Sequence, residues 1–183
     1  MGRHRCKSVV GKHEGGYIMS QSVLLDTSFF IRLLNPEEKL HKNALGYYRY
    51  FLENDIVLKV STIAIAEYCV RGDIFDLPLR NVMVLPFNIS HSVKAGKMMA
   101  HVYEEKKRRG AEMSQRAIIP NDTKMFAQAD VEDDICYYAT ADAECRKIYD
   151  ILKLGKECCP SFQFIDISIP FSSYFGEFDF EEK

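Results

Sequence analysis

Short apolar runs alternate with longer amphipathic segments along most of the chain. Residues 23–25 read Val-Leu-Leu and end at Asp26, a pattern typical of a strand buried on both faces of a parallel sheet. Four further strands are predicted at 56–60, 82–87, 135–140 and 162–167. Apolar residues recur at helical spacing between them, so repeated strand–helix units predict a three-layer α/β fold around a parallel sheet.

Capping residues indicate where the helices begin. Asn35, followed by Pro36 and Glu38, has the residue types that favour the first turn of a helix. Ser61 is expected to cap a helix that runs to about Val70. Three further helices are predicted. The first begins at Ser90 and ends at Gly110, the second begins at Asn121 and Asp122, and the third covers residues 141–154.

Composition favours one soluble domain. The chain has 183 residues, is 47% hydrophobic, and carries 24 basic against 26 acidic residues, for a net charge of −2. This balance excludes a strongly basic nucleic-acid coat, but it allows a nuclease that holds its substrate through metal ions. No run approaches the ~18 apolar residues that a bilayer span needs. Because the six cysteines show no CxxC spacing, we expect reduced thiols and a cytoplasmic protein.

The two ends differ from the middle. Residues 1–18 are basic and have no apolar core of a signal peptide. We interpret them as a flexible segment, either a misassigned start or a remnant of expression, with an RNA-contacting arm as the alternative. Residues 19–170 form the predicted domain. Residues 171–183 form an acidic, aromatic tail whose rings pack on this domain or on a second subunit, with mimicry of nucleic acid as the alternative.

Four acids carry the candidate chemistry. Asp26 and Asp142 follow the first and fourth predicted strands, Asp122 opens a helix, and Glu67 lies in an otherwise apolar helix. Ligands of parallel sheets bind beyond the carboxyl ends of strands. Four converging carboxylates would repel one another, and a divalent cation such as Mg²⁺ or Mn²⁺ would relieve that repulsion. Such a cation can activate a water for phosphoryl displacement.

Simpler roles stay open for these and other polar residues. Asp26, Asp122 and Asp142 could each be a helix cap, and Glu67 could pair with an Arg or Lys. The run Lys106, Lys107, Arg108 and Arg109 fits a solvated helix end, or else a rim that contacts RNA phosphates. The acids at 130 and 132–134 are interpreted as a solvated loop, with metal binding as the alternative. The five histidines show no ligand spacing, so we expect solvent-facing or structural roles.

The motifs in order resemble a known family. Leu-Leu-Asp26-Thr-Ser, Ala-Glu67, Asn-Asp122 and Thr140-x-Asp142 together resemble the PIN-domain family, in particular the VapC-type ribonuclease toxins of type II toxin–antitoxin systems. The resemblance covers roughly residues 20–168. It implies a five-stranded parallel sheet in the order 3-2-1-4-5.

The resemblance also implies an activity. Family members cleave RNA with Mg²⁺ or Mn²⁺, commonly dimerise, and are silenced by a small antitoxin protein. Carried over by position, the metal ligands and catalytic residues are Asp26, Glu67, Asp122 and Asp142. The residues expected to orient them are Thr27, Ser28, Thr140 and Glu144.

Other functions are weaker. A PIN nuclease of RNA processing or decay, or a non-catalytic PIN-like scaffold that binds RNA or protein, stays open. A phosphatase with Asp26 as nucleophile would require a second Asp where Ser28 stands. A dinucleotide-binding dehydrogenase is excluded because no GxGxxG follows the first strand. The RNA target, the cleavage position, and the choice between one and two metal ions are not specified by the sequence.

Overall fold

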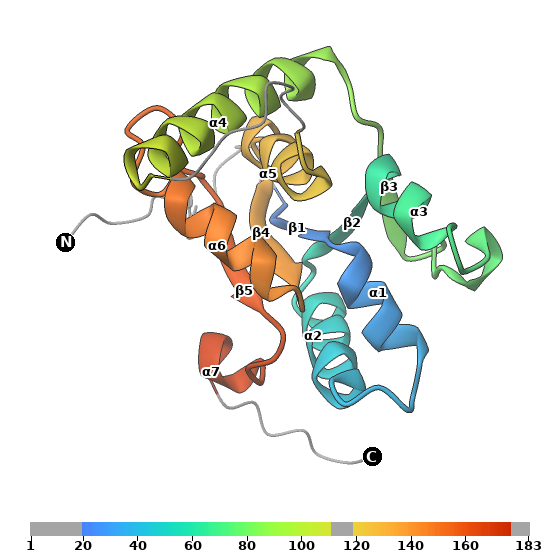
Figure 1. Cartoon of the computed structure of the whole chain (residues 1–183). Helices are drawn as coiled ribbons and strands as arrows, with labels where there is room; N and C mark the ends of the chain where they lie inside the picture. The colour runs from blue at the N-terminus through green and yellow to red at the C-terminus, as the bar shows by residue number, and fades with distance from the viewer. Residues whose placement is uncertain (1–19, 111–118, 177–183) are drawn as a thin grey trace, which may run out of the picture.

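Five parallel strands form one sheet in the order β3-β2-β1-β4-β5 (Figure 1). The computed structural model describes residues 20–110 and 119–176. The strands are β1 (Ser22–Leu25), β2 (Val57–Ser61), β3 (Val82–Leu85), β4 (Ile135–Thr140) and β5 (Gln163–Asp166). The predicted fold class and strand order are therefore confirmed.

Helices cover both faces of this sheet, which makes three layers (Figure 1). One group contains α1 (Thr27–Leu34), α2 (His41–Glu53) and α3 (Thr62–Tyr68). The other contains α4 (Ile89–Arg108), α5 (Asn121–Val131) and α6 (Ala143–Leu152), with α4 packed along α5 and against α6. A 3-10 turn, η1 (Ile74–Asp76), and a short helix, α7 (Ser172–Phe175), complete the described elements.

The central strand explains the apolar run that opens the domain. Val23, Leu24 and Leu25 are fully buried because β1 pairs with β2 on one side and β4 on the other, under helices on both faces. The chain leaves this strand directly into Asp26, which lies at the carboxyl end of the sheet. Strand burial thus fixes the position of the first candidate acid.

Two helix starts differ from the prediction. Asn35 ends α1, and its Oδ1 accepts a hydrogen bond from the Glu37 N–H at 3.1 Å, so the Asn-Pro sequence forms a turn and α2 begins only at His41. The prediction of a helix starting at Asn35 is wrong. Ser90 does not cap α4 either: Asn88 Oδ1 accepts from the His91 N–H at 3.1 Å, in a capping box.

The acids before β4 do not form a solvated loop, which corrects the prediction. Three of them are paired with basic side chains: Asp130 with Lys94 at 2.6 Å, Glu132 with His91 at 2.9 Å, and Asp134 with Lys59 at 2.7 Å. His91 and Lys59 are buried, so each needs a polar partner. These acids therefore have structural roles at the end of the sheet where β1 and β4 begin.

The start of the aromatic tail packs on the same domain. Phe171 and Phe175 contact α2, where the rings of Tyr50 and Phe175 stack with centroids 4.3 Å apart. Tyr174 Oη accepts a hydrogen bond from the backbone N–H of Asp166 at 3.2 Å. The basic segment 1–18 and the acidic end of the tail lie outside the described residues.

No helix within the described ranges has both the length and the apolar character needed to cross a membrane.

Candidate metal centre

All four predicted acids line one cavity of about 740 Å³ at the carboxyl end of the sheet. Asp26 follows β1 and caps α1, and Asp142 follows β4 and caps α6, where its Oδ1 accepts from the Glu144 N–H at 2.8 Å. Asp122 lies in the first turn of α5, and Glu67 lies on α3. The capping role and the cavity role of Asp26 and Asp142 therefore coexist, because a cap at the end of a strand also faces the cavity.

Asp26 is held by two hydroxyl groups. Its Oδ2 accepts hydrogen bonds from Ser28 Oγ at 2.6 Å and from Thr140 Oγ1 at 2.7 Å. The side chain is only 4% exposed, and burial raises the pKa of its carboxyl despite these hydrogen bonds. A buried carboxylate of this kind gains most from a cation that would replace its lost hydration.

The same two hydroxyls tie neighbouring strand ends together. Ser28 Oγ accepts from the backbone N–H of Ala141 at 2.8 Å, and Thr140 Oγ1 accepts from the backbone N–H of Asp142 at 2.9 Å. Each hydroxyl thus donates to Asp26 and accepts from the segment that carries Asp142. The network fixes both acids relative to each other across β1 and β4.

Glu67 is held by neutral donors. Thr27 Oγ1 donates to one carboxylate oxygen at 2.5 Å, and Asn121 Nδ2 donates to the other at 2.7 Å. The Lys124 ammonium donates to the Asn121 Oδ1 at 2.9 Å. Among the described residues, no Arg or Lys forms an ion pair with Glu67, so the alternative of a basic partner is not supported. Asn121 is a site residue that the sequence analysis placed in the Asn-Asp122 motif and at a helix start, without a role at the site.

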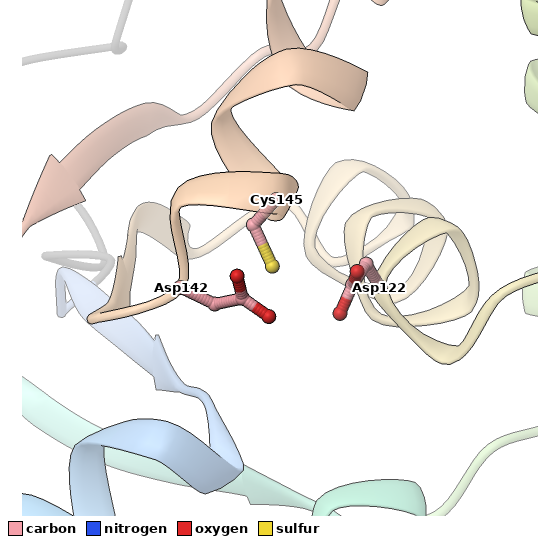
Figure 2. Close-up of side chains that lie close together, drawn as sticks. All are labelled: Asp122, Asp142 and Cys145. Carbon is pink, nitrogen blue, oxygen red and sulfur yellow. The ribbon is translucent and has the colours of Figure 1, made fainter.

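Asp122 completes the set together with a residue that the sequence analysis missed. Oxygen atoms of Asp122 and Asp142 and the Sγ atom of Cys145 lie within 4.8 Å of one another (Figure 2). Burial raises the pKa of Asp122 to about 6; the hydrogen bond with Cys145 opposes this shift, and the charges of Asp26, Asp142 and Glu67 add to it. Burial is thus the main cause of the raised pKa, and repulsion among the converging carboxylates adds to it.

The four carboxylates share their cavity with one basic side chain of the described residues, Arg71. None of them forms an ion pair with a Lys, Arg or His in the two described ranges. The neutral donors fix the orientation of Asp26 and Glu67 but leave the negative charge in place. Clustered, oriented carboxylate oxygens are the ligands that Mg²⁺ and Mn²⁺ prefer, so this donor set fits such an ion.

Two predicted groups lie apart from the cavity. The Glu144 side chain is 69% exposed and pairs with Lys147 at 2.6 Å on the surface of α6. Lys106, Lys107, Arg108 and Arg109 are exposed at the end of α4, and they are not among the residues that line the cavity. A role of this basic run in RNA contact stays a prediction.

Comparisons place the fold among known structures. The sequence matches no protein-family model and no curated protein. A chain from the crystal structure of VapBC2 from Rickettsia felis, bound to a DNA fragment from their promoter, has 15% identity and a TM-score of 0.52; the match covers 80% of this chain and 98% of that one. FitAcB from Neisseria gonorrhoeae gives the same identity, TM-score and coverage. The chain has a VapC-like PIN fold.

The PIN fold gives the cavity its composition. In this strand order, β1 and β4 are neighbours, so residues that follow them must lie side by side although they are far apart in the sequence. Helices α3 and α5 bring Glu67 and Asp122 to the same cavity. The sequence likeness to VapBC2 and FitAcB is low, so the comparison concerns the fold.

Proposed function

We propose that this protein is a metal-dependent endoribonuclease that hydrolyses RNA phosphodiester bonds and acts as the toxin of a toxin–antitoxin pair. The observation that carries the proposal is the cavity with four carboxylates, none of which forms an ion pair with a basic side chain of the described residues. The PIN-family resemblance of the motifs supports the same activity. Asp26, Glu67, Asp122 and Asp142 would hold Mg²⁺ or Mn²⁺.

The chain's own residues would prepare this site before substrate arrives. Ser28 and Thr140 hold Asp26, while Thr27 and Asn121 hold Glu67, so the carboxylates need little reorganisation when a cation binds. A bound divalent cation would lower the pKa of a water and stabilise negative charge on the phosphate that is attacked. The Glu144 side chain pairs with Lys147, so Glu144 would support the site only through its backbone N–H, which donates to Asp142.

The surroundings of the acids suit a nucleic-acid strand. Arg71 and Tyr68 line the same cavity, which offers a cation for a phosphate and a ring for a base. A second hollow of about 420 Å³ shares Glu67 and Val70 with the first and extends to Asn121. Two hollows that share lining residues and have mixed polar and apolar walls favour an extended substrate over a small molecule.

The partners follow from the same proposal. A toxin of this class would be paired with a small antitoxin protein that covers the cavity, and it would form a homodimer. The exposed apolar residues Ile31 and Val70, which line the cavity, would suit such a cover. A PIN nuclease of RNA processing or decay is the second candidate, and it would need no such partner.

The central test is cleavage of RNA by Asp26→Asn. Asn keeps a side-chain oxygen for the α1 cap but removes the charge, so we expect the fold to persist and Mg²⁺-dependent cleavage to fall by at least ~100-fold. EDTA should stop the wild-type reaction and Mn²⁺ should restore it. The matched control is Asp150→Asn, which changes an exposed acid on α6. This variant should cleave RNA like the wild type.

Each outcome separates the candidates. Undiminished cleavage by Asp26→Asn, free of host nuclease, would contradict the site. Absence of cleavage in the wild type on structured and single-stranded RNA would favour the non-catalytic scaffold. Growth arrest on expression of wild type but not of Asp26→Asn, relieved by the protein encoded beside it, would support the toxin over the RNA-processing nuclease.

A further inference from the structure

A sulfur atom lies among the proposed oxygen ligands. Cys145 is fully buried in the first turn of α6, three residues after Asp142, so both side chains lie on the same side of the helix start. Figure 2 shows the Cys145 sulfur directed toward the carboxylates of Asp142 and Asp122, and the three ligand atoms lie within 4.8 Å of one another. Mg²⁺ has little affinity for sulfur, so the resemblance to a magnesium enzyme does not account for this thiol.

A second buried group faces the same cluster. The Tyr138 side chain on β4 is fully buried, and its hydroxyl makes no hydrogen bond of normal geometry to a described residue. Burial is the main reason that the pKa of Tyr138 is raised; nearby Asp26, Cys145 and Asp122 add to the shift, and an interaction with the Cys145 thiol contributes as well. A buried hydroxyl is normally paired, so a Cys145 thiolate would give this one an acceptor.

We propose that Asp122, Asp142 and Cys145 form a binding site for Zn²⁺ that shares two ligands with the proposed Mg²⁺ site and so excludes Mg²⁺ when occupied. One thiolate and two carboxylates are accepted zinc ligands, and three protein ligands leave one tetrahedral position open to the cavity. Zinc binds mixed N, O and S sites far more tightly than Mg²⁺ does.

Binding would need no oxidant or reductant. The S–H bond of Cys145 breaks, its proton passes to solvent, and a sulfur lone pair forms the bond to Zn²⁺ without change of oxidation state. The consequence, which rests on the proposed function, is that Zn²⁺ holds the nuclease inactive through the residues that would otherwise bind Mg²⁺.

The test is metal binding by the full-length protein after removal of metal with a chelator. Co²⁺ serves as a coloured probe, because a thiolate ligand gives a sulfur-to-cobalt charge-transfer band, and Zn²⁺ affinity is measured by competition with a chromogenic chelator. Cys145→Ser should lose the band and bind Zn²⁺ roughly 10–100-fold more weakly. Asp122→Asn should weaken Zn²⁺ binding while the thiol remains.

Matched controls test three of the other thiols. Cys69→Ser and the double variant Cys158→Ser with Cys159→Ser change cysteines outside the cluster, and both should keep the band and the affinity. Thermal melting of each variant checks folding, and Cys145→Ala replaces Cys145→Ser if the latter melts early. A band and Zn²⁺ affinity that persist in the Cys145 variant would overturn the proposal.

The outcome is separable from that of the proposed function. Zinc binding is read from spectra and competition, without RNA, whereas wild-type cleavage of RNA with Mg²⁺ is a separate assay. A zinc site without Mg²⁺-dependent cleavage would reject the nuclease and keep this site. Cleavage that is insensitive to stoichiometric Zn²⁺ in the wild type would reject the shared ligands.

Discussion

At the scale of one residue, Asp122 shows how a side chain of the candidate site can lower the stability of the native state. Burial and three nearby acids raise the pKa of its carboxyl from 3.8 to about 6, so the native protein binds this proton more tightly than the unfolded chain does. Between about pH 4 and pH 6 the native state therefore holds more protons. Its stability falls as pH rises through this window, and the loss persists at neutral pH.

Asp122→Asn should consequently stabilise the protein when no metal is bound. We expect its melting temperature in EDTA at pH 7.5 to exceed that of the wild type by a few degrees, since 1 kcal/mol corresponds to about 2–4 °C for a domain of this size. The difference should shrink toward pH 4.5, where native Asp122 is already protonated. The exposed-acid variant Asp150→Asn should show no such trend, and a less stable Asp122→Asn at pH 7.5 would contradict the interpretation.

Cys145 marks the limit of what single positions reveal. The acids Asp26 and Asp142 could be predicted because each follows a buried strand. Cys145 has no such signal: a cysteine on the buried face of an amphipathic helix is ordinarily a core residue, and only the folded positions of α5 and α6 bring it to Asp122. Asn121 was visible in its motif, but its contact with Glu67 depends on how α3 and α5 are placed.

At the scale of elements, strands were easier to predict than helix starts. A buried parallel strand needs continuous apolar residues, and the run at 23–25 has them. A helix start depends on a few polar atoms that can form other local structures. Asn35 uses its Oδ1 for a turn, and Asn88 takes the cap of α4 that was assigned to Ser90. The parallel sheet follows from the pattern, whereas its strand order was available only from the family resemblance.

The cap of α4 can be tested directly. Asn88→Ala removes the acceptor for the His91 N–H, which should cost about 1 kcal/mol and lower the melting temperature by about 2–4 °C. Ser90→Ala removes only a hydroxyl that donates to Asn88 Oδ1 and should cost less. A larger loss in Ser90→Ala than in Asn88→Ala, measured by thermal melting, would contradict the capping assignment.

At the scale of the whole molecule, the acids at the two ends of the sheet differ in whether they form ion pairs. Where β1 and β4 begin, acids pair with basic residues such as Lys59 and Lys94. At the carboxyl end, the cavity gathers acids without such partners in the described residues. The net charge of −2 therefore says little about function, because it sums the paired acids at one end of the sheet with the unpaired acids at the other.

A divalent cation should therefore stabilise the entire domain. Metal that binds the native state alone, at a hundredfold excess over its Kd, adds about 2.7 kcal/mol, or roughly 5–10 °C in melting temperature. We expect Mg²⁺ or Mn²⁺ to raise the wild-type melting temperature, EDTA to reverse the rise, and Asp26→Asn to show little response. An equal rise in Asp26→Asn would place the stabilising ion elsewhere.

The unbalanced carboxylates at the cavity also have a kinetic consequence. For the proposed nuclease, an empty cavity of four acids would repel the phosphates of an approaching RNA, and a bound divalent cation would offset part of that charge. Association would then favour a sequence with the cation first and the polyanion second. The association rate constant for RNA would rise with cation occupancy, so the same acids would govern the binding of both metal and substrate.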